Sequence, residues 1–125
     1  MNAYLFVATG GALGALIRFW INVNLDKLHP SDFPWGTVLV NVLGSFLIGV
    51  LFILFAEKIS VSDQTKSFLT VGFLGAMTTF STFSLDAILL LDQGEYNAAF
   101  FYIMGSIITC LIATFLGMNL TRIMF

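Results

Sequence analysis

The sequence has few charged residues, a single cysteine and only two prolines. Charged side chains make up 10% of the 125 residues, whereas hydrophobic ones make up 58%. A soluble domain carries about a quarter charged residues, so the composition excludes an ordinary soluble protein and indicates an integral membrane protein. Five basic and seven acidic residues give no basic surface for nucleic acid. One cysteine excludes an internal disulfide, and one histidine leaves no cluster with metal-ligand spacing.

Four long apolar runs dominate the chain. Each is close to the roughly 20 residues that an α-helix needs to cross about 30 Å of hydrocarbon. The expected membrane spans are residues 3–25, 35–56, 68–91 and 98–118. The loops and tails between them are too short for a soluble domain. We therefore expect residues 1–125 to form a single all-α membrane domain.

The basic residues are only weakly biased toward one side of the membrane. Lys58, Lys66 and Arg122 lie on the side that holds the N-terminus. Lys27 lies on the other side, together with Arg18 if its side chain reaches that surface, so the balance is three against one or three against two. Orientation is normally fixed by an excess of Lys and Arg in cytoplasmic loops. So weak a bias is compatible with insertion in both orientations and an antiparallel dimer. It is also compatible with one orientation in which the second loop is cytoplasmic.

Small residues occur within the first three expected spans. They are Gly10, Gly14, Gly44, Gly72 and Gly75. Glycine lets helices approach one another closely in a membrane. We therefore expect tight helix contacts at these positions, mostly between subunits.

Two expected spans carry weakly polar side chains at every fourth position, which places them on one helical face. These residues are Thr37, Asn41 and Ser45 in the second span, and Tyr102, Ser106 and Cys110 in the fourth. Asn41 is the only strongly polar side chain of the second span, and its amide both donates and accepts hydrogen bonds. It is either a clamp between helices or part of a pore lining, and the spacing does not decide between them.

The third expected span contains five hydroxyl side chains within residues 78–84. Hydroxyls compete with the helix for backbone hydrogen bonds, and Gly72 and Gly75 weaken the helix just before them. We therefore expect this helix to be broken near the middle of the bilayer, at a place buried in protein. Phe80 and Phe83 lie near one face of the span. The edge of an aromatic ring carries partial positive charge, so it can approach a small anion.

Two charged residues fall within or beside the spans. Arg18 is the only basic residue well inside one, where it costs about 2.5–3.5 kcal/mol on insertion scales. We expect it to reach toward the interface or to serve an electrostatic or structural role. Asp86 lies beyond Ser84 in the third span, so we expect it nearer the membrane surface, as a helix-end carboxylate exposed to water.

Three ordered segments resemble the Fluc fluoride channels, also called the CrcB family. They are GGALGALIRF at residues 10–19, GTVLVNVLG at residues 36–44 and GFLGAMTTFSTFS at residues 72–84. The resemblance covers the whole chain and is most specific in the third segment.

The resemblance implies a fluoride-selective channel in a bacterial inner membrane, formed by an antiparallel, dual-topology homodimer. Two pores would let fluoride leave the cell passively. The implied pore residues are Asn41, Phe80, Phe83, Thr37, Thr82, Ser106 and Tyr102. The backbone carbonyls of Gly75 and Thr78 from both subunits would hold a structural sodium ion, and Arg18 would act electrostatically or structurally. Fluoride, a second copy and membrane lipid are thus the implied partners.

The alternatives are a small dual-topology multidrug-type transporter, a non-conducting membrane assembly subunit and an intramembrane enzyme. A transporter of this kind needs a membrane-embedded carboxylate, but the first span carries Arg18 and no acid. In an assembly subunit, Asn41 and the hydroxyl run would only clamp helices together. An intramembrane enzyme would need a base beside a serine, and the spans hold no histidine or lysine. We therefore predict that the protein is not an enzyme.

Overall fold

The computed structural model describes residues 2–125, which are helical apart from short connections. The elements are α1 (Ala3–Leu28), α2 (Trp35–Ile53), η1 (Leu54–Lys58), α3 (Asp63–Lys66), η2 (Ser67–Leu74), α4 (Gly75–Met77), α5 (Ser81–Asp92) and α6 (Tyr96–Met124). The four segments long and apolar enough to cross a membrane are Ala3–Leu28, Trp35–Lys58, Asp63–Asp92 and Tyr96–Met124. The prediction of an all-α protein with four potential membrane helices is confirmed, since residues 2–125 contain no strand.

The ends of several helices have clear local causes. α1 stops before His29, because this residue precedes Pro30 and a residue before proline avoids the helical conformation. α3 begins after Ser62, whose side chain accepts a hydrogen bond from the Thr65 backbone N–H. Gly94, with φ of 78°, makes the tight connection between α5 and α6. The residues that end the helices lie outside the apolar runs from which the spans were predicted. Each helical segment therefore extends a few residues beyond its predicted span.

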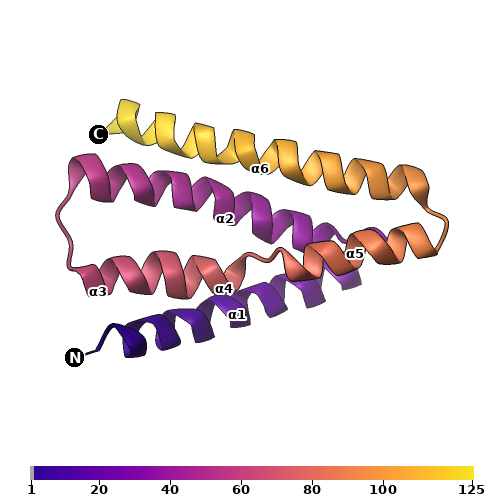
Figure 1. Cartoon of the computed structure of the whole chain (residues 1–125), viewed down its shortest axis with the longest axis horizontal. Helices are drawn as coiled ribbons and strands as arrows, with labels where there is room; N and C mark the ends of the chain where they lie inside the picture. The colour runs from indigo at the N-terminus through magenta and orange to yellow at the C-terminus, as the bar shows by residue number, and fades with distance from the viewer. Residues whose placement is uncertain (1) are drawn as a thin grey trace.

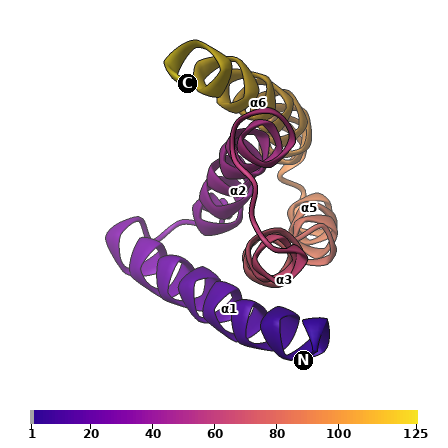
Figure 2. The same ribbon diagram turned by 90° about the vertical axis from the view of Figure 1, so that its left-hand side faces the viewer.

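The four segments alternate in direction (Figure 1). Both ends of the chain and the 59–62 connection lie at one end of the bundle, and the 29–34 and 93–95 connections lie at the other. α2 packs along α6, while α1 packs against η2 and α4 (Figure 2). The third segment is therefore held between α1 on one side and the α2–α6 pair on the other.

Two stretches, η1 and η2, have wider turns than an α-helix. In such turns a backbone N–H bonds to the carbonyl five residues back, as Ile59 N does to Leu54 O at 2.8 Å. Wide turns of this kind are frequent at functional sites. Here η2 leads directly into α4, where the third segment changes conformation.

Glycines let α1 approach the third segment closely. A Cβ atom on Gly10 would collide with the carbonyl oxygen of Phe68, and one on Gly14 with the carbonyl oxygen of Phe73. The tight contacts predicted here are present, but they join two parts of one chain. The expectation that they lie mostly between subunits is wrong for these two glycines, because the chain's own backbone fills the space. Gly75, in contrast, is exposed.

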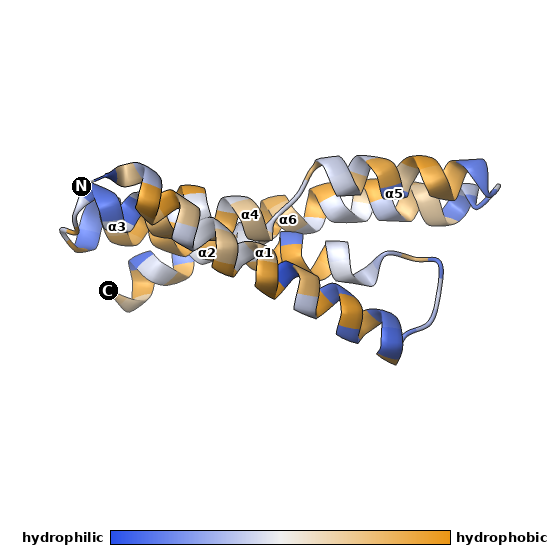
Figure 3. Cartoon of the chain, turned by 90° about the horizontal axis from the view of Figure 1, so that it is seen from below, coloured by the Kyte–Doolittle hydropathy of each residue, from blue (hydrophilic) through white to orange (hydrophobic). Residues whose placement is uncertain are grey.

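Large apolar side chains cover much of the outside of the bundle, and polar residues gather at its ends (Figure 3). The buried core includes two small clusters. One contains Phe83, Leu90, Ala99 and Tyr102, and the other contains Val40, Leu74 and Met77. A bundle that exposes so many large apolar side chains is suited to lipid or to a second copy, and not to water.

Candidate functional site

The third helical segment changes conformation between α4 and α5. α4 ends at Met77, Thr78 is extended with φ of −86° and ψ of 160°, and α5 begins at Ser81. The Thr78 N–H still donates to the Leu74 carbonyl at 3.0 Å, but the helical hydrogen-bond ladder is interrupted after it and resumes with the bond from Ser84 N to the Phe80 carbonyl at 2.8 Å. Buried backbone groups require other partners when this happens, and side chains near them supply several.

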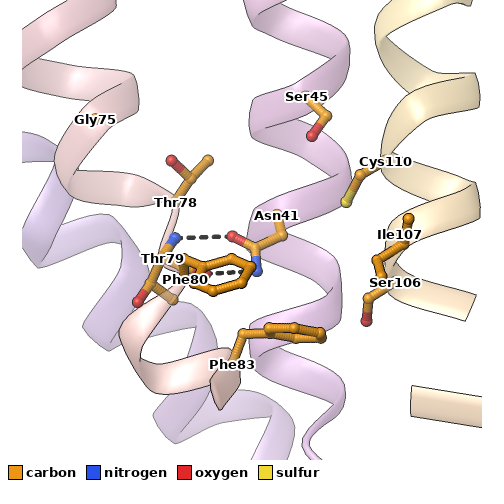
Figure 4. A pocket seen from close by; sticks show the side chains of 10 residues that line it. All are labelled: Asn41, Ser45, Gly75, Thr78, Thr79, Phe80, Phe83, Ser106, Ile107 and Cys110. Atoms are coloured by element: carbon orange, nitrogen blue, oxygen red, sulfur yellow. Dashed lines mark hydrogen bonds between the residues drawn. The ribbon is translucent and has the colours of Figure 1, made fainter. Parts of the chain in front are cut away.

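Asn41 on α2 supplies two of these partners. Its Nδ2 donates to the Thr79 carbonyl at 2.9 Å, and its Oδ1 accepts from the Thr79 N–H at 2.8 Å (Figure 4). One amide side chain thus replaces both backbone hydrogen-bond partners that Thr79 would have in a helix. The clamp interpretation of Asn41 is correct, and the side chain also lines the cavity described below. One hydrogen of its amide is not used in this pairing.

The same rearrangement leaves two backbone carbonyls without their helical donors. In an α-helix the Thr79 N–H would bond to the Gly75 carbonyl and the Thr82 N–H to the Thr78 carbonyl. Instead, Thr79 N donates to Asn41, and Thr82 N donates to Thr79 Oγ1 at 3.1 Å. The carbonyl oxygens of Gly75 and Thr78 are thereby freed as ligands for a cation or as acceptors for water.

A cavity of about 370 Å³ lies beside this conformational change. Residues from α2, from the third segment and from α6 line it: Asn41, Ser45, Gly75, Thr78, Thr79, Phe80, Phe83, Ser106, Ile107 and Cys110 (Figure 4). None of these side chains carries a formal charge. The two polar stripes predicted on the second and fourth spans meet here through Asn41, Ser45, Ser106 and Cys110.

Ser106 is the one lining hydroxyl that is both buried and unbonded within the described residues. The residue is 6% exposed, and its Oγ has no hydrogen-bond partner in residues 2–125. Leaving a buried polar group unpaired costs about 1–3 kcal/mol. Ser106 is therefore a candidate hydrogen-bond donor to a small ligand in the cavity.

Phe80 and Phe83 form an aromatic wall of the cavity. Their ring centroids are 5.4 Å apart, with ring planes inclined at 44°. Phe83 is 8% exposed, whereas Phe80 is 77% exposed on the surface of the single chain. The Phe83 ring also lies 5.1 Å from the ring of Tyr102 on α6. The two phenylalanines are thus neighbours, as the spacing predicts, but only Phe83 belongs to the chain's own core.

Asp86 is not the water-exposed helix-end residue that the sequence led us to expect. It lies in the middle of α5 and is only partly exposed. Its Oδ2 accepts hydrogen bonds from Thr37 Oγ1 at 2.9 Å and from the Tyr102 hydroxyl at 3.1 Å. The prediction was wrong because it placed the residue by distance from the hydroxyl run. Its spacing from Phe83 and Leu90 places Asp86 on the helix face that they bury.

The structure brings most of the sequence-predicted site residues together. Those that line the cavity are Asn41, Phe80, Phe83, Ser106, Gly75 and Thr78. Thr37 and Tyr102 are next to them, around Asp86. Thr82 and Arg18 do not line the cavity; both are partly exposed. Arg18 contributes a backbone carbonyl that accepts from Asn22 Nδ2 at 3.0 Å.

Membrane-length helices around an uncharged cavity lined by hydrogen-bonding groups define a small multi-pass membrane protein. The chain belongs to the CrcB-like family, since the family described as "CrcB-like protein, Camphor Resistance (CrcB)" matches residues 5–118. The resemblance found in the sequence is thereby confirmed.

Three similar proteins carry the name fluoride-specific ion channel FluC. The one from Agrobacterium fabrum is 44% identical over 119 residues, which cover 95% of each chain. The one from Hahella chejuensis is 46% identical over 118 residues, covering 94% of this chain and 93% of the relative. The one from Shewanella loihica is 45% identical over 120 residues, or 96% of each chain. These relatives are named as ion channels and not as enzymes, in agreement with the prediction for this protein.

Proposed function

We propose that this protein is a fluoride channel that lets fluoride cross the membrane passively. The cavity carries the proposal, because it combines the amide of Asn41, the unpaired hydroxyl of Ser106 and the rings of Phe80 and Phe83 without any charged side chain. The names of the similar proteins support the choice of ion.

The chemistry of the lining suits a small anion that must enter and also leave. Fluoride sheds tightly held water, so the path must offer replacement hydrogen bonds. The free amide hydrogen of Asn41 and the Ser106 hydroxyl are such donors, and the aromatic edges add weak positive potential. A lysine in the same place would hold the ion too firmly. Thr37, Thr82 and Tyr102 would continue the polar lining toward the membrane surface.

The functional unit is proposed to be an antiparallel, dual-topology homodimer with two pores. Phe80 and Gly75 are exposed on the single chain although they belong to the site, so a second copy is needed to enclose it. The weak bias of basic residues is compatible with insertion both ways. In a bacterial inner membrane, with a negative cell interior, passive flow through this dimer would expel fluoride.

Dual insertion is tested by labelling from one side of the membrane. In a Cys110→Ser background, Ser60→Cys places one thiol in the exposed 59–62 connection. A membrane-impermeant maleimide applied to intact cells should modify about half of the molecules, because half expose that connection outside. Labelling of all molecules or of none would contradict dual topology.

The freed carbonyls of Gly75 and Thr78 fit a sodium ion, since hard cations prefer oxygen ligands. We propose that the helix is broken near the middle of the bilayer and that these two carbonyls from each copy hold the ion at the dimer axis. When bound, the ion would neutralise the carbonyl dipoles and tie the copies together. Arg18, outside the cavity, would contribute only to the electrostatic field or to helix anchoring.

Removing sodium is expected to destabilise the dimer. Protein purified with choline in place of sodium should melt at a lower temperature and dissociate more readily, because the four carbonyls lose their shared ligand. Thermal unfolding measures the melting temperature, and size-exclusion chromatography measures dissociation of the dimer. Adding sodium back should restore the melting temperature and the dimer. Identical melting in sodium and in choline would argue against the ion site.

Fluoride efflux from proteoliposomes tests the proposed function directly. Vesicles containing the purified protein are loaded with fluoride, valinomycin balances the charge with potassium, and a fluoride electrode follows the release. Rapid fluoride release without chloride release is the expected result. Absence of fluoride release would favour a multidrug-type transporter or a non-conducting assembly subunit. Asp86 is the membrane-embedded carboxylate that the transporter would use, and uptake of a cationic dye driven by a pH gradient would support that alternative.

Replacing Phe80 tests the aromatic wall. Phe80→Ile is expected to lower the efflux rate about tenfold, because isoleucine keeps apolar bulk but has no ring edge to face an anion. Phe100→Ile is the matched control, since Phe100 is also exposed but lies outside the cavity lining. Equal rates for Phe80→Ile and wild type would contradict a role of this ring in the path.

A further inference from the structure

The aromatic wall of the cavity continues beyond the site to the connection between α1 and α2. Next to Phe83 lies Tyr102, and 5.6 Å from the Tyr102 ring lies the ring of Phe33, inclined at 47°. The Phe33 ring is in turn 4.6 Å from that of Trp35 at the start of α2. Three aromatic contacts therefore link the exposed Phe80 to Phe33 in the 29–34 connection, and a fourth joins Phe33 to α2.

Phe33 is held firmly although it belongs to a connection. Its carbonyl accepts from the Trp35 N–H at 2.9 Å, and its side chain is partly buried against the cluster that contains Phe83 and Tyr102. The neighbouring residue, Asp32, lines a small polar recess together with Asp86. The 29–34 connection thus lies next to both Tyr102 and Asp86, through Phe33 and Asp32.

Two contacts position the Tyr102 side chain: Asp86 holds its hydroxyl, and Phe33 packs against its ring. The hydroxyl donates to Asp86 and the Cβ atom is held by the backbone of α6, so the ring can still rotate about the axis between these two points. The rings of Phe33 and Phe83 contact the Tyr102 ring and limit that rotation. Without Phe33, the Tyr102 ring could turn away from Phe83 and alter both the aromatic wall and the bond to Asp86.

We infer that Phe33 is a positioning residue for ion conduction, which acts by holding Tyr102 against Phe83 and Asp86. The first connection between helices is then part of the conduction machinery. This inference rests on the proposed channel function. It differs from the pore assignment because Phe33 is not required to touch the ion.

A double-mutant cycle in the efflux assay tests the inference. Phe33→Ala is expected to lower fluoride efflux about tenfold in the wild-type background, because loss of an aromatic contact frees the Tyr102 ring. In a Tyr102→Ala background the same substitution should change the rate less than about twofold. Phe33→Trp should restore most of the rate. Equal losses in both backgrounds, or no loss in either, would overturn the inference.

Controls separate positioning from folding. Phe125→Ala removes an exposed ring at the end of the chain and should leave the rate unchanged. If Phe33→Ala does not give a monodisperse protein, Phe33→Leu replaces it, since leucine keeps apolar bulk without a ring. A wild-type protein that releases no fluoride would refute the channel proposal instead.

A measurement that does not involve fluoride transport tests separately whether Phe33 holds the Tyr102 ring in place. The protein contains three tyrosines, so ¹⁹F NMR of protein labelled with 3-fluorotyrosine gives few signals, and Tyr102→Phe assigns one of them. Phe33→Ala should shift and broaden the Tyr102 signal and leave those of Tyr4 and Tyr96 unchanged. A Tyr102 signal unaffected by loss of Phe33 would overturn the inference, whatever the efflux rates.

Discussion

Asn41→Asp is expected to reduce fluoride efflux about a thousandfold. Two unit charges about 4 Å apart repel by about 4 kcal/mol at the effective dielectric constant typical of proteins, and each 1.4 kcal/mol added to a barrier slows a rate about tenfold. The carboxylate would also be unable to donate to the Thr79 carbonyl, which Asn41 Nδ2 now holds at 2.9 Å. Both effects act at the same place in the path.

Asn119→Asp is the matched control for this substitution. Asn119 lies on α6 and donates to the Phe115 carbonyl at 2.7 Å, so it also pairs an amide with a backbone oxygen. It is not among the residues that line the cavity. Efflux through Asn119→Asp should remain close to that of wild type. A fluoride rate through Asn41→Asp within about threefold of wild type would remove Asn41 from the proposed path.

Gly14→Leu is expected to destabilise the folded chain by about 3 kcal/mol or more. The Cβ position of Gly14 lies 2.9 Å from the carbonyl carbon of Phe73 and 3.1 Å from the Met77 nitrogen. These neighbours are backbone atoms and cannot rotate away, so α1 must separate from η2 and α4. Thermal unfolding in detergent should show a large drop in melting temperature, with much of the protein aggregated.

Gly105→Leu provides the comparison for this prediction. Gly105 is also a helical glycine, but apart from its own helical turns no atom of residues 2–125 lies within 4 Å of its Cβ position. Leucine has a higher helix propensity than glycine by up to about 1 kcal/mol, so the folded chain should tolerate this substitution. Equal melting temperatures for the two variants would show that the close approach of α1 is not required.

The helices and their order could be predicted because each depends on local sequence. Four apolar runs, separated by prolines and short polar stretches, are sufficient to define four membrane-length segments. The polar stripes were also visible, since residues four apart share a helical face. The Asn41–Thr79 pairing was not, because it joins positions 38 residues apart and exists only where Thr78 leaves the helix.

Asp86 shows where the sequence interpretation failed. A carboxylate near the end of an apolar run is usually solvated, and that expectation ignored the restart of helix at Ser81. The restart places Asp86 among the buried residues of α5 and opposite Thr37 and Tyr102. The site was therefore predicted best where side chains line one helix, and least well where three separate helices meet.

The double pairing of Asn41 with Thr79 has a kinetic consequence for the proposed channel. Because the backbone already occupies most of the bonding capacity of this amide, a passing anion would meet a single N–H there. Such a contact gives a short residence time, and short residence at each stop is what allows rapid turnover. The two hydrogen bonds that hold the interrupted helix at Thr79 would thus also shorten the time that an anion stays bound to Asn41.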